Sequence, residues 1–208
     1  MKVELIAVTK YLRGNGTPEE LLEHAGRVCY RSEKRGEAGS FLQARIREGH
    51  ESIIEHASLT YEISGISRAC SHQLVRHRIA SYSQESQRYV DLSEPELVVP
   101  PSVAQSPEAM KIWDELTGRM KDAYQDLRRL GIRKEDSRFL LPQATATRIV
   151  VTMNFRELLH FFGVRCDRAA QWEIRALAKE MLKLAYQVAP SVFQDLYIEF
   201  IGEGTADA

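Results

Sequence analysis

The sequence carries almost no net charge. Its 28 Lys and Arg residues are balanced by 29 Asp and Glu residues, which leaves a formal net charge of -1. Proteins that coat nucleic acid or bind membrane surfaces usually have a global excess of basic residues. A general role of either kind is therefore disfavoured, and a cationic binding site must be local.

Cysteine is also scarce. The chain has three cysteines, at positions 29, 70 and 166, and none of them forms a Cys-x-x-Cys pair. An odd number of distant cysteines indicates reduced thiols rather than a disulfide framework. The first ten residues, MKVELIAVTK, hold only a short apolar run, which predicts neither a signal peptide nor a membrane span. We expect a cytoplasmic protein that does not bind membranes.

Several familiar motifs are missing. The sequence has no G-x-G-x-x-G turn after a strand, no phosphate-binding P-loop and no Ser-His-Asp nucleophile elbow. The segment HESIIEH places His50 and His56 six residues apart, whereas a zinc-binding helix needs them four apart. We therefore predict no metal site.

The hydrophobic pattern predicts one α+β domain over residues 1–208. Leu59, Tyr61 and Ile63 alternate with polar residues, which is typical of a half-buried antiparallel strand. The full set of predicted strands covers 3–8, 57–66 and 145–153, with an extended segment at 95–101. Helices are predicted over 17–30, 41–47, 67–76, 107–130, 133–139 and 154–165, with a final helix over 170–188 and a frayed tail at about 202–208.

The segment RHRIASYSQESQRY, Arg76–Tyr89, gathers three arginines in fourteen residues. It has no apolar periodicity and is predicted to be a loop. Arginine binds phosphate oxygens with a planar fork of donors, so this loop is suited to a phosphate or pyrophosphate. An alternative is a solvated basic loop paired with acids such as Glu51 and Glu55, and the composition leaves both open.

Smaller clusters have ordinary explanations when taken alone. Arg156 and His160 lie four residues apart on one helix face, and Arg165 near the helix C-terminus complements the helix dipole. Arg138 reads as a surface residue, and His50 as a cap before a strand.

Together, these residues resemble the flavin-dependent thymidylate synthases. Arg76-His77-Arg78, followed after seven residues by Ser86, resembles the RHR-x7-S signature of that family. The other matching blocks follow in family order and extend the resemblance over about residues 1–193: His50-x-Ser52-x-x-Glu55-His56, Gln73, Arg88, Arg138 before LLP, Asn154-x-Arg156, and Arg165 before AQWEI (170–174).

The resemblance implies a reaction and an assembly. The family makes dTMP from dUMP, with 5,10-methylenetetrahydrofolate as carbon donor, reduced FAD as hydride donor and NADPH as the reductant of the flavin. It implies a central, mainly antiparallel sheet flanked by helices, in a homotetramer whose active sites are shared between subunits. No nucleic acid is expected as a partner.

The resemblance also implies roles for residues. Arg165 is expected to be catalytic, because a fixed cation stabilises the negative charge that the uracil ring develops. Ser86 is expected to position the base, because a serine nucleophile needs an adjacent base. His50 is expected to orient water or the folate. The implied FAD ligands are Ser52, Glu55, Arg76, His77, Arg78, Ile79, Asn154, Arg156 and His160. The implied dUMP ligands are Gln73, Gln84, Glu85, Ser86, Arg88, Arg138 and Arg165.

The chain departs from some family members at two positions. Gln84 stands where others have Glu, and Ala169 where others have a flavin-contacting His, which puts one FAD contact in doubt. No cysteine lies in the Pro-Cys-His context of the classical thymidylate synthases, which favours the flavin route. Two other hypotheses are a nucleic-acid-binding module that uses 76–88, and a nucleotide-binding relative that has lost catalysis.

Overall fold

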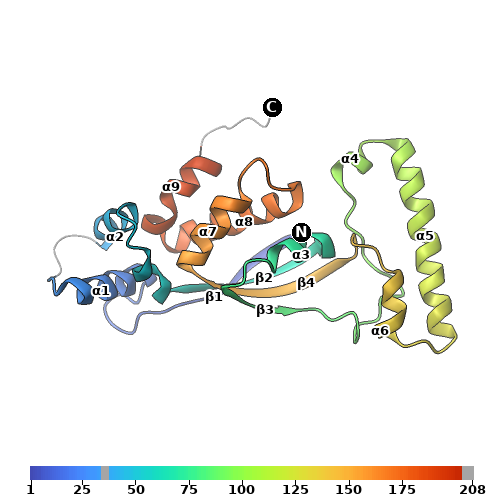
Figure 1. Ribbon diagram of the computed structural model, residues 1–208, viewed down its shortest axis with the longest axis horizontal. Helices are drawn as coiled ribbons and strands as arrows, with labels where there is room; N and C mark the ends of the chain where they lie inside the picture. The colour runs from blue at the N-terminus through green and yellow to red at the C-terminus, as the bar shows by residue number, and fades with distance from the viewer. Residues whose placement is uncertain (34–37, 203–208) are drawn as a thin grey trace. The chain divides into compact units, whose positions relative to one another are not determined.

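The computed structural model of the chain describes residues 1–33 and 38–202 (Figure 1). The strands are β1 (Lys2–Val8), β2 (Ser58–Ser67), β3 (Ala80–Gln84) and β4 (Ala146–Asn154). The α-helices are α1 (Pro18–Tyr30), α2 (Ala38–Arg47), α3 (Arg68–Leu74), α4 (Pro101–Ala104), α5 (Pro107–Arg129), α6 (Lys134–Ser137), α7 (Phe155–Arg165), α8 (Trp172–Val188) and α9 (Pro190–Phe200). Two 3-10 helices are η1 (Glu51–His56) and η2 (Arg138–Leu140).

In the described part of the chain, four strands form one sheet in the order β1-β2-β4-β3. Neighbouring strands are antiparallel, because the end of one pairs with the start of the next. The Thr9 amide donates to the Ser58 carbonyl over 3.1 Å, and the Arg68 amide donates to the Thr145 carbonyl over 2.9 Å. The predicted α+β fold, with an antiparallel sheet flanked by helices, is confirmed.

The chain divides into two compact units. The first contains Met1–Lys2, Ser64–Gln73 and Ser83–Ile149, and the second contains Val3–Ile63, Leu74–Tyr82 and Val150–Ala208. The prediction of a single domain over 1–208 stays a prediction.

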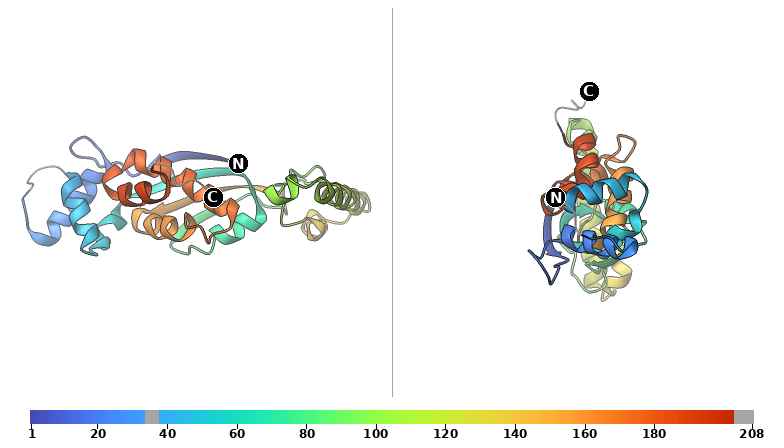
Figure 2. Two further views of the ribbon diagram at one scale, coloured as in Figure 1. Left: turned by 90° about the horizontal axis from the view of Figure 1, so that it is seen from above. Right: turned by 90° about the vertical axis from the view of Figure 1, so that its left-hand side faces the viewer.

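The core of the second unit lies between its strands and α7 to α9. These helices gather over one face of β2 and β4 (Figures 1 and 2). The predicted alternation of β2 is confirmed, since Leu59, Tyr61 and Ile63 are fully buried. The Tyr61 hydroxyl donates to the carbonyl of Met181 in α8 over 3.2 Å, which satisfies a buried polar group at the centre of this layer.

The helix starts follow from their capping residues. Thr17 accepts a hydrogen bond from the Glu20 amide over 3.2 Å, and the Glu20 carboxylate accepts one from the Thr17 amide, which completes a capping box on α1. Asn154 caps α7 by accepting from the Glu157 amide over 2.8 Å. The cap orients α7 as it leaves β4, and three candidate site residues lie on that helix.

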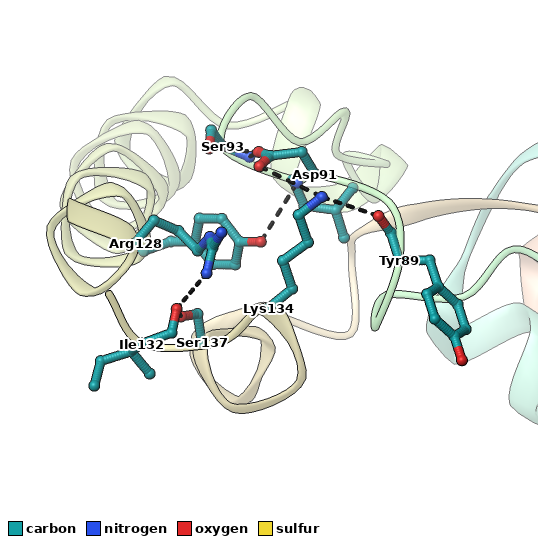
Figure 3. A network of polar contacts seen from close by, with 9 residues as sticks. Tyr89, Asp91, Ser93, Arg128, Ile132, Lys134 and Ser137 are labelled. Atoms are coloured by element: carbon teal, nitrogen blue, oxygen red, sulfur yellow. Dashed lines mark hydrogen bonds and ion pairs between the residues drawn. The ribbon is translucent and has the colours of Figure 1, made fainter. Parts of the chain in front are cut away.

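In the first unit, the loop after Ser86 is held against α5 and α6 by a polar network (Figure 3). Lys134 donates to the Tyr89 carbonyl over 2.9 Å and lies 3.8 Å from the Asp91 carboxylate. Asp91 in turn accepts from the Ser93 amide over 2.9 Å, and the Tyr124 hydroxyl accepts from the amide of Leu92. This network positions the segment that carries Ser86 and Arg88.

The helix predicted at 107–130 is confirmed as α5, and the apolar residues that recur on it at helical spacing are partly buried. Tyr124 is buried, and Met110, Trp113, Met120 and Leu127 are half-buried. Leu116 is 66 % exposed, and Ile112, which was not part of the predicted face, is 68 % exposed. Ile112 and Leu116 lie four residues apart, so both exposed apolar side chains lie on one face of the helix.

Two structural predictions are corrected. The segment 76–89 is not wholly a loop: residues 80–84 form the edge strand β3, held by backbone pairing to β4 rather than by apolar side chains. The helix at 172–188 is not the last, because Pro190 occupies the first position of α9, where its missing amide costs nothing. The short helix α4 begins at the end of the predicted extended segment 95–101 and continues into residues for which no element was predicted. Of the frayed tail predicted at about 202–208, residues 203–208 lie outside the described residues.

Candidate active site

A cavity of about 1080 Å³ opens in the second unit. Its wall is built from η1, the 76–79 turn, α7 and α9, so segments distant in the sequence line one space. Most of the predicted FAD ligands line this cavity: Glu55, Arg76, His77, Arg78, Ile79, Asn154, Arg156 and His160. Arg165 lines the cavity as well. Ser52 does not line it and is exposed on η1.

The 76–79 turn is fixed by its backbone. The His77 amide donates to the Leu74 carbonyl over 3.1 Å. The Tyr82 hydroxyl lies 2.9 Å from the Leu74 carbonyl and 2.8 Å from the His77 carbonyl, so it shares its proton between them. β3 thus holds the turn through Tyr82, and the exposed Arg76 and Arg78 flank the buried His77 in the sequence and line the cavity with it.

The arginines of the cavity differ in their partners. Arg156 pairs with Glu55 and, at 3.3 Å, with Glu51, and these contacts raise its pKa. Arg76 and Arg78 contact no carboxylate within the described part of the chain. Glu51 and Glu55, the acids named in the alternative of a paired basic loop, bind Arg156 instead, whereas Arg88 of that loop does pair with a distant acid, Glu135. Arg76 and Arg78 leave two guanidinium groups that an anion can bind.

A chain of three side chains crosses the cavity wall. His77 Nδ1 lies 3.2 Å from Glu157 Oε1, and Arg165 Nε donates to His77 Nε2 over 3.0 Å. His77 and Glu157 are each 6 % exposed. Burial, reinforced by Arg165 and His160, lowers the pKa of His77 to about 4, and burial raises the pKa of Glu157. His77 is therefore a neutral imidazole at pH 7.

The predicted dUMP ligands other than Arg165 all belong to the first unit. Gln84 is fixed, since its amide nitrogen donates to Ser71 over 2.9 Å and to Thr147 over 3.2 Å. The Glu85 amide donates to the Arg148 carbonyl over 2.8 Å, so this amide is used inside the sheet. Ser86 accepts from the Arg88 amide over 3.3 Å, which shapes the turn after β3.

Two cationic side chains of this set have partners. Arg88 binds the Glu135 carboxylate over 3.2 Å, and hydrogen bonds from Arg133 and Arg88 lower the pKa of Glu135. Arg138 donates to the Glu135 carbonyl over 3.1 Å. An incoming phosphate therefore competes with a carboxylate for Arg88.

Sequence reasoning missed several residues. Burial and the nearby Arg138 lower the pKa of Arg68, which marks two like charges close together in the first unit. Glu157 and Asp195 line the cavity of the second unit. Glu157 looked like an ordinary acidic residue in the first turn of a helix, and no sequence signal pairs it with a histidine 80 positions away.

His50 lies outside the cavity lining. Its Nδ1 hydrogen-bonds the Tyr30 hydroxyl, and the two rings stack with centroids 5.9 Å apart. The role predicted for His50 in orienting water or folate stays a prediction. The three cysteines are free thiols, two of them buried. No helix in 1–33 or 38–202 combines the length and the apolar composition needed to cross a lipid bilayer.

Comparisons with known proteins agree with this geometry. Residues 7–191 match the family described as thymidylate synthase complementing protein. A protein from Geobacter sulfurreducens named flavin-dependent thymidylate synthase is 50 % identical over 189 residues, covering 86 % of this chain and 82 % of that protein. Relatives of the same name from Nitratidesulfovibrio vulgaris and Mycobacterium avium are 44 % and 38 % identical, covering 92 % and 99 % of this chain and 85 % and 93 % of their own.

These matches extend over most of the chain and define an enzyme. The chain belongs to the family of flavin-dependent thymidylate synthases. The donor set of the cavity fits a flavin nucleotide, because a pyrophosphate needs cationic forks without competing carboxylates, and Arg76 and Arg78 provide them.

Proposed function

We propose that this protein catalyses the reductive methylation of dUMP to dTMP. In this proposal 5,10-methylenetetrahydrofolate donates the carbon, FAD is the cofactor and NADPH is the reductant. The observation that carries the proposal is a cavity of about 1080 Å³ lined by the RHR turn, with two arginines that lack carboxylate partners in the described chain and with Arg165 in the same wall. Its volume is at the upper end of the range for ligand pockets, as a dinucleotide requires.

Within this proposal, each group of residues has a separate task. Arg76 and Arg78 bind the pyrophosphate of FAD, and Ile79, Asn154, Arg156 and His160 line the rest of the flavin site. Ser52 is kept as a weaker candidate, because it lies outside the cavity lining. A bound reduced flavin supplies the hydride.

The substrate is assigned to a second set. Arg88 and Arg138 bind the phosphate of dUMP, and Gln73, Gln84, Glu85 and Ser86 position the nucleoside. The Gln84 nitrogen is already used by Ser71 and Thr147, so this residue binds the nucleoside through its carbonyl oxygen. Arg165 stabilises the negative charge that uracil must carry before its C5 attacks the methylene carbon.

The protein is further proposed to be a cytoplasmic homotetramer with active sites shared between subunits, and to use neither nucleic acid nor a membrane. The exposed Ile112 and Leu116 of α5 support the assembly, because contact with another chain would remove their apolar surface from water. Light scattering at several protein concentrations tests the subunit number.

The reaction is tested by tritium release from dUMP labelled at C5. The wild-type protein with FAD, NADPH and methylenetetrahydrofolate is expected to release tritium and form dTMP. Arg165→Ala is expected to lower the rate by about 10² to 10³-fold, as loss of a group that stabilises transition-state charge does. Arg168→Ala, which removes an exposed arginine outside the cavity, serves as the matched control. No release by the wild type contradicts the function, and an unaffected Arg165→Ala contradicts the catalytic role.

A further inference from the structure

The contact between Arg165 and His77 determines the tautomer of the histidine. A guanidinium keeps all its protons at any ordinary pH, so Arg165 Nε is a donor. His77 Nε2, 3.0 Å away, must therefore present its lone pair. In a neutral imidazole the proton then lies on Nδ1, which faces Glu157 Oε1 at 3.2 Å. Glu157 accepts this proton in a hydrogen bond and thereby stabilises the only tautomer that can bind Arg165.

The imidazole has little freedom to leave this arrangement. The ring of Phe161 meets it edge-on, with centroids 4.9 Å apart and an interplanar angle of 84°. The His160 ring lies 5.7 Å away, and Tyr82 holds the His77 backbone carbonyl. A protonated His77 would direct a second N–H at the Arg165 guanidinium, so the low pKa of His77 follows from the same geometry.

A neutral acceptor has a consequence that a carboxylate would not have. A carboxylate beside a guanidinium offsets its field, as Glu51 and Glu55 do for Arg156 in the same cavity. The imidazole orients Arg165 through Nε without adding a negative charge next to it. Glu157 contacts the opposite ring nitrogen of His77.

We propose that Glu157 and His77 are positioning residues, which hold the Arg165 guanidinium in one orientation for the uracil ring. This inference rests on the proposed function of Arg165. The family resemblance assigns His77 to the flavin, and this proposal gives His77 a second task in the chemistry of the nucleotide. It also assigns Glu157 the task of setting the tautomer.

The first test reads the tautomer directly and does not depend on activity. Long-range proton–nitrogen NMR spectra of protein labelled with 15N-histidine separate the two ring nitrogens of each of the six histidines. His77→Gln identifies the signals of His77 by their loss. At pH 7 we expect a proton on Nδ1 and a bare Nε2, with the Nε2-protonated form appearing in Glu157→Leu, which has no acceptor for the Nδ1 proton. An imidazolium, or a wild-type proton on Nε2, would overturn the proposal.

The second test compares kinetics with flavin affinity. Glu157→Leu and His77→Phe are expected to lower the kcat of dTMP formation by about 10²-fold, since a misplacement of about 1 Å of a catalytic group has that effect. Glu157→Leu should leave the flavin dissociation constant nearly unchanged. His77→Gln should recover most of the kcat lost in His77→Phe, because an amide offers one acceptor and one donor.

Glu23→Leu is the matched control, because Glu23 is 3 % exposed and pairs with Arg27 outside the cavity. Equal losses of kcat in His77→Gln and His77→Phe, accompanied by equal losses of flavin affinity, would reduce His77 to a flavin ligand and overturn the proposal. An unchanged kcat in Glu157→Leu would do the same. If the wild type forms no dTMP, the proposed function fails. The NMR experiment still decides whether His77 has the tautomer that accepts a hydrogen bond from Arg165.

Discussion

The neutral His77 predicts that the folded protein loses stability in mild acid. Unfolded histidine has a pKa of about 6.5, whereas the pKa of the folded His77 is lowered to about 4. Between these values the unfolded chain binds a proton that the folded chain does not, so stability falls as the pH falls. The full difference corresponds to about 3 kcal/mol, of which about 2 kcal/mol is lost by pH 5.

The contribution of His77 to the pH dependence of folding stability can be isolated with His77→Gln, because glutamine does not titrate. Glu157, His160, Arg165 and Tyr82 surround His77 in both proteins, and the raised pKa of Glu157 gives a contribution of opposite sign that is common to both. Urea unfolding at pH 8, 7, 6 and 5, at constant protein concentration, measures the two stabilities. The wild type should lose about 2 kcal/mol more than His77→Gln between pH 8 and pH 5. Parallel curves would refute the assignment of a neutral, buried His77.

Three further predictions concern the two ligand sets and the packing. Glu135→Gln removes the carboxylate that competes with dUMP for Arg88, and it should lower the KM for dUMP by up to about fivefold, which corresponds to the energy of an exposed ion pair. An unchanged KM in initial-rate assays would show that the Arg88–Glu135 pair does not affect dUMP binding. Arg78→Gln should weaken FAD binding by about 10 to 100-fold in a fluorescence titration, as loss of a charged hydrogen bond does, and full affinity would remove this residue from the flavin site. Gly26→Ala places a Cβ 2.7 Å from a ring carbon in the α1–α2 packing and should cost about 1–3 kcal/mol in thermal unfolding, whereas Gly163→Ala, with open space at its Cβ, should be neutral or stabilising; equal effects would contradict the packing.

The elements that the sequence predicts well are those with local causes. The Thr17 capping box, the Asn154 cap and the alternation of β2 each depend on residues a few positions apart, and all three are confirmed. β3 was missed because its stability comes from backbone pairing to β4, which leaves no apolar period in Ala80–Gln84. α5 shows the opposite case: its period predicts the helix correctly, but the burial that the period also predicts is incomplete, since Leu116 is 66 % exposed.

The candidate site follows the same division. The RHR turn and the donors of α7 could be recognised in the sequence, and the cavity brings most of them together. The contact between His77 and Glu157 joins residues 80 positions apart, and that between Arg165 and His77 joins residues 88 apart. Such pairs depend on how β4 and α7 pack beside the turn, and no local pattern encodes them.

The central claim is that this chain binds a flavin whose reduction depends on the nucleotide. The most direct measurement is the visible absorption spectrum of the protein with FAD, before and after NADPH is added, with and without dUMP. The account predicts an oxidised-flavin band that NADPH bleaches when dUMP is present. A spectrum that shows no bound flavin with FAD in excess would contradict it.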